Sequence, residues 1–340
     1  MCIFVSYINM RFYCILFGQI LKGLLVTRLW NFCKLTFTFI LSHCFKIHRF
    51  TGLPAFVSIE PTNICNLRCP ECPTGNQTST VGKGKITVEL CQKLMPQIEK
   101  TVFFANLYFQ GEPFVNEQMI SIIKTASNAR ILTSISTNAH FITEKNADEI
   151  VKSGLTKLII SLDGYDQKSY ETYRRNGTFQ KVLDGMKAIQ QAKIQNKSHL
   201  PLVELQCLLF KHTENHKNEI RQIGKEYGAD IIQFKTAQFY DEQNIEMLPS
   251  QKNSRYTQEN GKLTIKNKLK NKCWKMWSSC IIAWNGNVLP CCFDKNHTFS
   301  YGNIQEKSLA EIWFSKPYTN FRKLVHTERG KISMCQNCTS

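Results

Sequence analysis

Three cysteines stand close together in the segment TNICNLRCPECPTG, at positions 65, 69 and 72. Their CxxxCxxC spacing on a loop would let three thiolates surround one face of an iron–sulfur cube and leave the fourth iron open for a small molecule. A zinc knuckle or a redox pair of thiols is the alternative, but the paired CxxC motif or nearby histidine typical of such sites is absent here. We therefore predict an iron–sulfur site with an open position at Cys65, Cys69 and Cys72.

A second set of cysteines lies near the C-terminus, where six of the fifteen cysteines follow residue 272. The predicted ligands are Cys273, Cys291, Cys335 and Cys338, of which the last two form a CxxC motif. Four thiolates would saturate an iron–sulfur cluster, so we predict a role in electron transfer or structure rather than in substrate ligation. A tetrahedral zinc site stays open as the alternative, because four cysteines bind either metal.

The segment between these C-terminal cysteines carries a turn signal and three further side chains of interest. Asn285 and Gly286 predict a hairpin turn between two short strands, which would bring the first two ligands opposite each other. Cys280 or Cys292 could replace a neighbouring ligand without changing the count of four. Asp294, just past the turn, could act as a base or orient the cluster, although an exposed turn carboxylate explains it at least as well.

Apolar runs that alternate with helical patterns predict the elements that position these cysteines. From residue 54 onward the chain shows the pattern of βα units and a parallel sheet. The six runs are 55–59, 101–109, 131–137, 157–162, 202–209 and 231–235. Gly154 and Gly228 stand where helix C-terminal caps belong, and Pro96 should kink or shorten the first helix. The first cysteine triplet directly follows the first run, and six units fall short of a full barrel.

This cysteine loop after the first strand resembles the hallmark of the radical S-adenosylmethionine (SAM) superfamily. The resemblance implies an α/β fold, a partial (β/α)6 TIM-like barrel, with a catalytic 4Fe-4S cluster whose open iron binds the amino and carboxylate groups of SAM. It also implies reductive cleavage of SAM to methionine and a 5′-deoxyadenosyl radical, which abstracts a hydrogen atom from the substrate. The protein's part is ligation, orientation and exclusion of water and oxygen.

The resemblance extends to the end of the second predicted strand, where a barrel presents functional residues. Gly111, Glu112 and Pro113 match most of the family's GGEP motif, which receives the methionine ammonium. A carboxylate suits that cation electrostatically. Gln110 departs from the motif by replacing its first glycine.

Polar residues also end the third and fourth predicted strands. The positions that resemble family contacts to ribose or to the methionine carboxylate are Ser136, Asn138, Ser161 and Asp163. Each is also an ordinary turn or capping residue, so their register on successive strands carries the prediction. Glu71 departs from the family, which usually has an aromatic residue there that contacts adenine. Gln206 and Lys235 could face the active site, although alternation along a buried strand explains them equally well.

The C-terminal cysteines resemble a SPASM-type domain in its shortened, twitch-like form, with ligands for one auxiliary 4Fe-4S cluster. We therefore predict a basic amphipathic helical extension over 1–53, a radical SAM core over 54–240 and an auxiliary iron–sulfur domain over 273–340. Residues 241–272 are polar and lysine-rich without an apolar period, which predicts a linker.

Residues 1–59 contain no Asp or Glu, yet carry six Arg and Lys side chains among many apolar ones. Their uncharged stretches fall short of the ~20 residues needed to span a bilayer. No clear signal-peptide cleavage site follows, and export would oxidise the downstream thiols, so we expect a cytoplasmic protein. Two interpretations of this segment stay open: helices packed on the domain, and peripheral docking at a membrane interface.

The formal net charge of +17 suits a phosphate-bearing substrate, an anionic membrane or an acidic electron-donor protein, and by itself chooses none of them. The resemblance implies a flavodoxin- or ferredoxin-type electron donor. We expect no nucleic-acid partner, because the chain has no recognition-helix, RRM-like or C2H2 pattern.

Family members with comparable tails oxidise or crosslink peptides and sugars, so the resemblance implies an oxidoreductase. We favour oxidation of a carbohydrate-like alcohol over peptide or sulfatase-type maturation, because the tail provides for one auxiliary cluster and no N-terminal peptide-recognition domain is evident. A non-catalytic iron–sulfur or zinc protein, docked on a membrane through its first residues, is the alternative from a different class.

Overall fold

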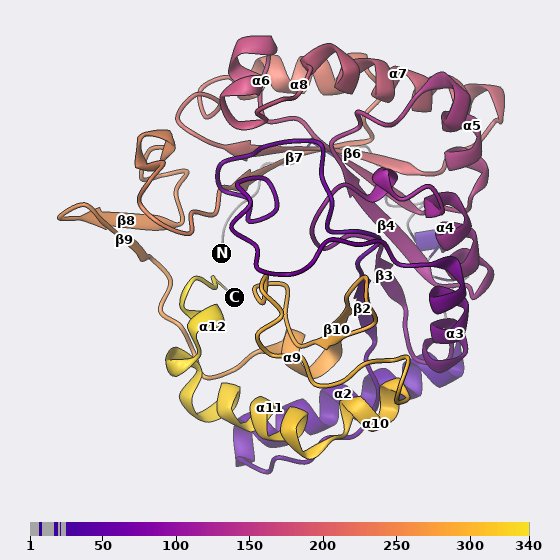
Figure 1. Cartoon of the computed structure of the whole chain (residues 1–340), viewed down its shortest axis with the longest axis vertical. Coiled ribbons are helices and arrows are strands. Elements are labelled where there is room, and N and C mark those ends of the chain that lie inside the picture. Colours follow the sequence, from indigo (N-terminus) through magenta and orange to yellow (C-terminus); the bar gives the residue numbers. More distant parts are fainter. Residues whose placement is uncertain (1–6, 9–16, 20, 22–24, 340) are drawn as a thin grey trace.

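The computed structural model describes residues 7–8, 17–19, 21 and 25–339. Its centre is a nine-stranded sheet in the order β1-β7-β6-β5-β4-β3-β2-β10-β11. Strands β2 to β7 are parallel neighbours in chain order, and helices cover their outer side (Figure 1). Within the described residues this sheet does not close into a full barrel. The predicted α/β fold of the partial-barrel type is confirmed.

The parallel strands fall inside the six predicted runs, except that the last strand extends one residue further, to Thr236. Their bounds are β2 (Phe56–Ile59), β3 (Phe104–Asn106), β4 (Leu132–Thr137), β5 (Lys157–Ser161), β6 (Leu202–Leu209) and β7 (Ile231–Thr236). Strands of such a sheet are covered on both faces and therefore read as nearly continuous apolar runs. A short strand, β1 (Tyr7–Ile8), pairs antiparallel with β7 at one edge.

The helices of the core follow the predicted periodicity. Their bounds are α3 (Val88–Ile98), α4 (Met119–Asn128), α5 (Glu144–Lys152), α6 (Gln167–Tyr173), α7 (Phe179–Gln195) and α8 (Lys217–Glu226). Gly154 and Gly228 have positive φ angles of 84° and 76° just beyond α5 and α8, which confirms both as C-terminal cap positions. Helix α3 continues through Pro96 and ends at Ile98.

The cysteine-rich C-terminal part extends the sheet of the core. Strand β10 (Ser279–Ile282) runs parallel to β2, and β11 (Val288–Leu289) pairs antiparallel with β10. Gly286 has a φ of 88° in the turn between them, so the predicted hairpin is confirmed. The surrounding helices are α9 (Trp274–Ser278), α10 (Leu309–Trp313), α11 (Lys316–Glu328) and α12 (Ser333–Gln336).

The segment predicted as a linker, residues 241–272, differs from that prediction because it contains a β-hairpin. Strands β8 (Tyr256–Glu259) and β9 (Lys262–Ile265) pair antiparallel and project from the body of the molecule (Figure 1). Asn260 and Gly261 join them with positive φ angles of 49° and 78°, as a type I′ turn requires. Because one side of the hairpin is solvent-exposed, its strands lack the apolar run that marked the central sheet.

The N-terminal helix α2 (Val26–Phe45) packs on the C-terminal part of the protein, so packing on the domain is what the structure shows for this part of the extension. Its Thr38 hydroxyl accepts a hydrogen bond of 3.0 Å from Nε1 of Trp277, and Ser42 lies 3.2 Å from His326 Nδ1 of α11. The basic residues Arg11 and Lys22 lie outside the described residues. Among the described residues, no helix combines the length and apolar character that crossing a bilayer requires.

Candidate active site

The three cysteines of the first loop lie together beyond the C-terminal end of β2. Burial raises the pKa of Cys65 to about 12, with further contributions from the charges of Glu112, Cys69 and Cys72. Burial likewise raises the pKa of Cys69 to about 11, where Arg174 opposes the shift and Cys72 adds to it. The three sulfur atoms are therefore within electrostatic reach of one another.

The chemistry of this donor set fits an iron–sulfur cluster. Thiols that resist deprotonation when buried become thiolates readily only beside a strong cation, and ligating irons supply that charge. The loop is also tightly wrapped, since a Cβ added to Gly75 would lie 2.6 Å from the carbonyl oxygen of Cys69. Among the described residues, no three His, Cys, Asp or Glu side chains lie close enough to hold a single metal ion.

The residues that follow β3 pack closely against the cysteine loop. Gly111 has a φ of 69°, and a Cβ there would lie 2.5 Å from the carbonyl oxygen of Thr62. The carboxylate of Glu112 is buried and accepts hydrogen bonds from the Thr137 hydroxyl and the Asn138 backbone N–H, both 2.7 Å long. Pro113 begins a short 3-10 turn after it. Glu112 therefore fixes the end of β4 against that of β3.

The polar residues predicted at the C-terminal ends of β4 and β5 lie on the same side of the sheet as the cysteine loop. Asn138 donates a 2.8 Å hydrogen bond to the side chain of Asn66, and its Nδ2 is 4.0 Å from Cys65 Sγ. Ser136 is the last residue but one of β4, and Ser161 is the last residue of the neighbouring parallel strand β5. The structure thus brings these predicted residues to the rim that carries the cysteine loop.

Asp163 is linked to the cysteine loop by Arg174, which was not among the site residues predicted from the sequence. Its carboxylate accepts 2.6 Å hydrogen bonds from Arg174 Nε and from the Leu208 backbone N–H. Arg174 in turn places Nη1 3.9 Å from Cys69 Sγ. Burial disfavours the charge of Arg174, but the opposing Asp163 and Cys69 raise its pKa well above the usual value. No local signal in the sequence distinguishes Arg174 from the arginine that follows it.

The two departures from the family motif have structural roles. Gln110 donates a 2.9 Å hydrogen bond to the carbonyl oxygen of Lys295, and it thereby ties β3 to the C-terminal part. The buried carboxylate of Glu71 accepts hydrogen bonds from the Tyr240 backbone N–H at 3.0 Å and from Asn244 Nδ2 at 2.5 Å. Both polar side chains join the cysteine loop region to distant segments.

The predicted C-terminal ligands also gather in space. Cys273, Cys335 and Cys338 surround Arg329, whose Nη2 lies 3.2 Å from Cys338 Sγ. Cys291 is close enough to Cys273 for the charge of Cys273 to raise its pKa, although the larger cause is its hydrogen bond with Cys292.

Two other predicted residues of this part have different surroundings. Cys280 is fully buried, and burial raises its pKa to about 12 while the charge of Arg322 opposes the rise. Asp294 is buried rather than exposed, which corrects the interpretation of an exposed turn carboxylate. Its two oxygens accept backbone hydrogen bonds from Thr298 at 2.8 Å and Phe299 at 2.9 Å, so the carboxylate orders the loop after Cys292.

Two adjoining cavities connect the cysteine sites. The smaller, about 300 Å³, is lined by Cys72 and Lys235, and the larger, about 610 Å³, by Cys291 and Cys292. The side chains that line both are Phe109, Gln238, Tyr240 and Lys295. Of the two strand residues that could face the active site, Lys235 lines the smaller cavity, and Gln206 lines neither of the two.

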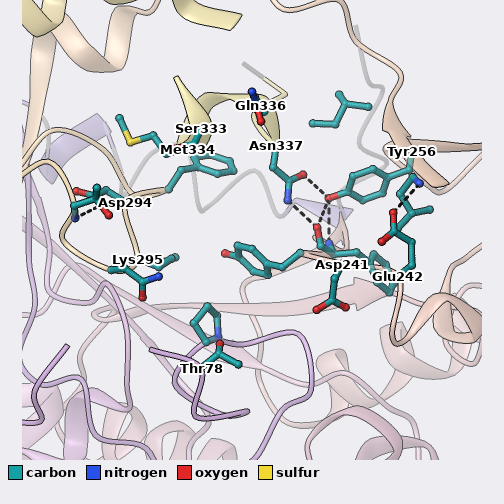
Figure 2. Close-up of a pocket in the computed structure, with 18 of the residues that line it drawn as sticks. Thr78, Asp241, Glu242, Tyr256, Asp294, Lys295, Ser333, Met334, Gln336 and Asn337 are labelled. Atoms are coloured by element: carbon teal, nitrogen blue, oxygen red, sulfur yellow. Dashed lines mark hydrogen bonds between the residues drawn. The ribbon is translucent and has the colours of Figure 1, made fainter. Parts of the chain in front are cut away.

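A third cavity, about 680 Å³, lies between the hairpin of β8 and β9 and the C-terminal segment. Figure 2 shows Asp241 and Glu242 on one side of it and Asp294 and Lys295 on the other. Asn337 accepts a 2.7 Å hydrogen bond from the Tyr256 hydroxyl at its edge.

The fold and the two cysteine sites define a partial-barrel protein built to hold iron–sulfur clusters. A model of the radical SAM superfamily matches residues 59–221, and a model of an iron–sulfur cluster-binding domain, SPASM, matches residues 273–339. The chain therefore belongs to the radical SAM superfamily and carries a SPASM domain. It is a radical SAM enzyme that uses SAM and 4Fe-4S clusters.

Curated relatives are similar over most of their length. A tungsten-containing aldehyde ferredoxin oxidoreductase cofactor-modifying protein from Pyrococcus furiosus is 25% identical, over 84% of this chain and 87% of the relative. A SAM-dependent 2-deoxy-scyllo-inosamine dehydrogenase from Niallia circulans is 24% identical, over 84% of this chain and 93% of the relative.

Solved structures share the fold. BtrN in complex with AdoMet and 2-DOIA superposes with a TM-score of 0.54 at 20% identity, covering 86% of this chain and 95% of that one. Streptococcus suis SuiB bound to S-adenosylmethionine gives a TM-score of 0.63 at 15% identity, covering 88% of this chain and 75% of that one.

Proposed function

We propose that this enzyme oxidises a small carbohydrate-like alcohol. The observation that carries the proposal is the pair of adjoining cavities between Cys72 and Cys291, which would place one substrate between two iron–sulfur sites. Their volumes of about 300 and 610 Å³ suit a small molecule. Asn106, Tyr108 and Gln238 line them with amide and hydroxyl groups, which can hydrogen-bond a polyhydroxylated ring.

We assign the first cluster to Cys65, Cys69 and Cys72, with SAM held along the rim formed by β3, β4 and β5. When bound, the cluster and SAM supply one-electron cleavage of SAM and the hydrogen abstraction that follows from it. The rim residues proposed to contact SAM are Gly111, Glu112, Pro113, Ser136, Asn138, Ser161 and Asp163.

The hydrogen bonds at the rim distinguish residues that position other side chains from a residue that can contact SAM. Glu112 and Asp163 are already engaged by protein groups, so they act mainly by holding Asn138 and Arg174 in place. Arg174, beside Cys69, is the cation best placed to attract the methionine carboxylate. Arginine suits that role because its planar fork matches a carboxylate.

Oxidation of an alcohol to a ketone removes two electrons and two protons from the substrate. One electron and one proton leave together as the hydrogen atom taken from carbon. An auxiliary cluster, which Cys273, Cys291, Cys335 and Cys338 would hold, would supply an acceptor for the second electron. The hydroxyl proton needs an acceptor, and Lys235 lines the cavity with a pKa that burial lowers. Asp294 stays a weaker candidate, because its oxygens serve the loop.

The partners of this reaction also belong to the proposal. A flavodoxin- or ferredoxin-type donor would supply the electron for SAM cleavage, and the net charge of +17 favours an acidic protein in that role. The thirteen described cysteines form no disulfide with one another, which agrees with a cytoplasmic location. Peripheral membrane contact through residues 1–53 also belongs to the proposal.

The test is turnover of a panel of polyols and aminocyclitols, including 2-deoxy-scyllo-inosamine, with SAM and an anaerobic reductant. The expected result is a ketone product, with deuterium transferred from the carbinol carbon of a labelled substrate into 5′-deoxyadenosine. SAM cleavage that no member of the panel stimulates, together with stimulation by a peptide, would reject the alcohol and support the second candidate.

That second candidate is peptide modification, which the third cavity favours. This cavity shares Tyr240, Phe293 and Lys295 with the cavity beside Cys291, so an extended chain could enter from there. Asp241 and Glu242 on its wall would suit a basic segment of such a peptide (Figure 2). Replacing Asp241 and Glu242 by Asn and Gln should leave oxidation of a small alcohol unchanged but weaken turnover of a peptide.

A further inference from the structure

Helix α2 buries four polar side chains against the protein, beside the apolar Phe32, Leu35 and Phe39, and exposes several large apolar side chains on its other side. Surface helices of soluble proteins normally do the opposite. The buried positions are Arg28, Asn31, Leu35, Thr38 and Ser42. The large exposed apolar side chains, with their exposed fractions, are Val26 (82%), Leu29 (41%), Trp30 (64%), Phe37 (62%), Ile40 (47%) and Phe45 (66%).

Specific contacts fix this orientation of α2. The guanidinium of Arg28 is fully buried and donates to the backbone carbonyls of Glu99, Ala129 and Arg130 at 2.7–2.9 Å, where α3 and α4 end. Asn31 exchanges two 2.8 Å hydrogen bonds with the backbone of Leu53. Rotation of the helix to hide its apolar side would leave these buried polar groups unpaired, which is costly.

The exposed apolar side chains form one continuous stripe. Positions 26, 30, 33, 37, 40 and 44 follow at three- and four-residue intervals, which places them on one side of a helix. Ile47, which follows the helix, is also exposed, as are Phe17 and Leu21 before it. A continuous apolar surface of this kind marks an interaction site.

The charges around the stripe restrict what can cover it. Residues 1–59 contain no acidic side chain, and Lys34, Lys46 and Arg49 are exposed on or just after α2. The ammonium of Lys34 lies 5.5 Å from the ring centre of Trp30, so the cation borders the apolar stripe. A second copy of the chain would bring the same positive charges against these and be repelled.

We propose that the outward stripe of α2 docks on a membrane surface that contains anionic lipids. The apolar side chains enter the boundary between headgroups and acyl chains, the basic side chains contact lipid phosphates, and Trp30 lies at the level of the headgroups. The helix lies in the plane of the interface and keeps its polar side on the protein. The helix thereby holds the enzyme at the surface of the bilayer.

Flotation of the reconstituted enzyme with lipid vesicles tests the proposal. We expect it to float with phosphatidylcholine vesicles that contain phosphatidylglycerol, and to be released in part by high salt, because the attraction to anionic lipid is screened. The double variant Trp30→Ser/Phe37→Ser should lower the partition coefficient by about tenfold or more, since it removes two large apolar side chains. Ile194→Ser, which alters an equally exposed apolar residue on α7, should float like the unchanged enzyme.

SAM cleavage shows that each variant is folded, because neither Trp30 nor Phe37 belongs to the active site. Three results would overturn the proposal: no flotation of the unchanged enzyme, equal flotation with purely zwitterionic vesicles, or flotation of the double variant at the unchanged level. A dimer in solution that the double variant dissociates would assign the stripe to a second copy instead. Quenching of Trp30 fluorescence by brominated lipid, lost in Trp30→Phe, would support docking.

Discussion

The two cysteine sites are assembled in different ways. Cys65, Cys69 and Cys72 lie on one loop after one strand, and that loop is held by the buried Glu112, which follows β3, and by Arg174 at the C-terminal end of α6. Cys273, Cys291, Cys335 and Cys338 come from distant parts of the C-terminal segment and meet only when β10, β11 and α12 have packed. The first site is therefore local in sequence and depends on polar support, whereas the second depends on tertiary packing.

Removing one ligand from each site should separate their roles most strongly. Cys69→Ala should abolish SAM cleavage, because the catalytic cluster loses an iron ligand. Cys338→Ala should keep much of the cleavage but stop substrate turnover, because only the auxiliary site is damaged. Chromatography of 5′-deoxyadenosine and of the oxidised product measures both, and unchanged product formation in either variant would contradict the assignment.

The polar support of the first site should be sensitive to loss of Arg174. Arg174→Met leaves the buried carboxylate of Asp163 without its charged partner, and we expect the free energy of unfolding to fall by about 3 kcal/mol. The double variant Arg174→Met/Asp163→Asn should recover part of this loss, because asparagine is neutral and its side-chain oxygen can still accept from Leu208 N–H. Anaerobic urea unfolding of the unchanged protein, of the single variants Arg174→Met and Asp163→Asn and of the double variant measures the coupling energy of the pair. A double variant as unstable as the sum of the single ones would show that the pair is not coupled.

A smaller effect on stability is expected at Gly111, where the backbone passes close to the first cysteine loop. Gly111→Ala adds a Cβ 2.5 Å from the Thr62 carbonyl oxygen at a φ of 69°, so we expect a loss of stability of about 1–3 kcal/mol and weaker iron incorporation. Gly82→Ala is the matched control, since a Cβ there meets nothing within 4 Å. Thermal unfolding and iron content compare the two, and equal behaviour would refute the role given to Gly111.

The smallest effect is expected where the two regions are joined. Gln110→Ala removes the hydrogen bond to the Lys295 carbonyl, which should cost about 1 kcal/mol and raise the KM for substrate severalfold while SAM cleavage alone is unchanged. Gln258→Ala, on the exposed side of β8, serves as the control. A Gln110→Ala variant with normal KM would show that this bridge does not shape the cavity.

The same contrast explains what the sequence could predict. The six parallel strands were predictable because each lies in a short apolar run between segments of helical periodicity, and the cysteine loop because its three ligands are close together in the sequence. The hairpin of β8 and β9 was missed since its strands are largely exposed and polar, although Asn260-Gly261 is a turn signal that could have revealed it.

Side chains that contact the cysteines only in the folded protein could not be predicted from the sequence. Arg174 and Arg329 reach cysteines only through tertiary packing, and no motif marks either of them. The amphipathic pattern of α2 was visible in the sequence, but its direction was not, because periodicity does not say which side of a helix faces the protein.

Anaerobic reconstitution with iron and sulfide tests the central claim most directly. The account predicts about eight irons per chain, from two 4Fe-4S clusters, and reductive cleavage of SAM. Replacing Cys65, Cys69 and Cys72 together by alanine should reduce the content to about four irons and abolish the cleavage. An unchanged iron content, or SAM cleavage that persists in this triple variant, would contradict the placement of the catalytic cluster on the first loop.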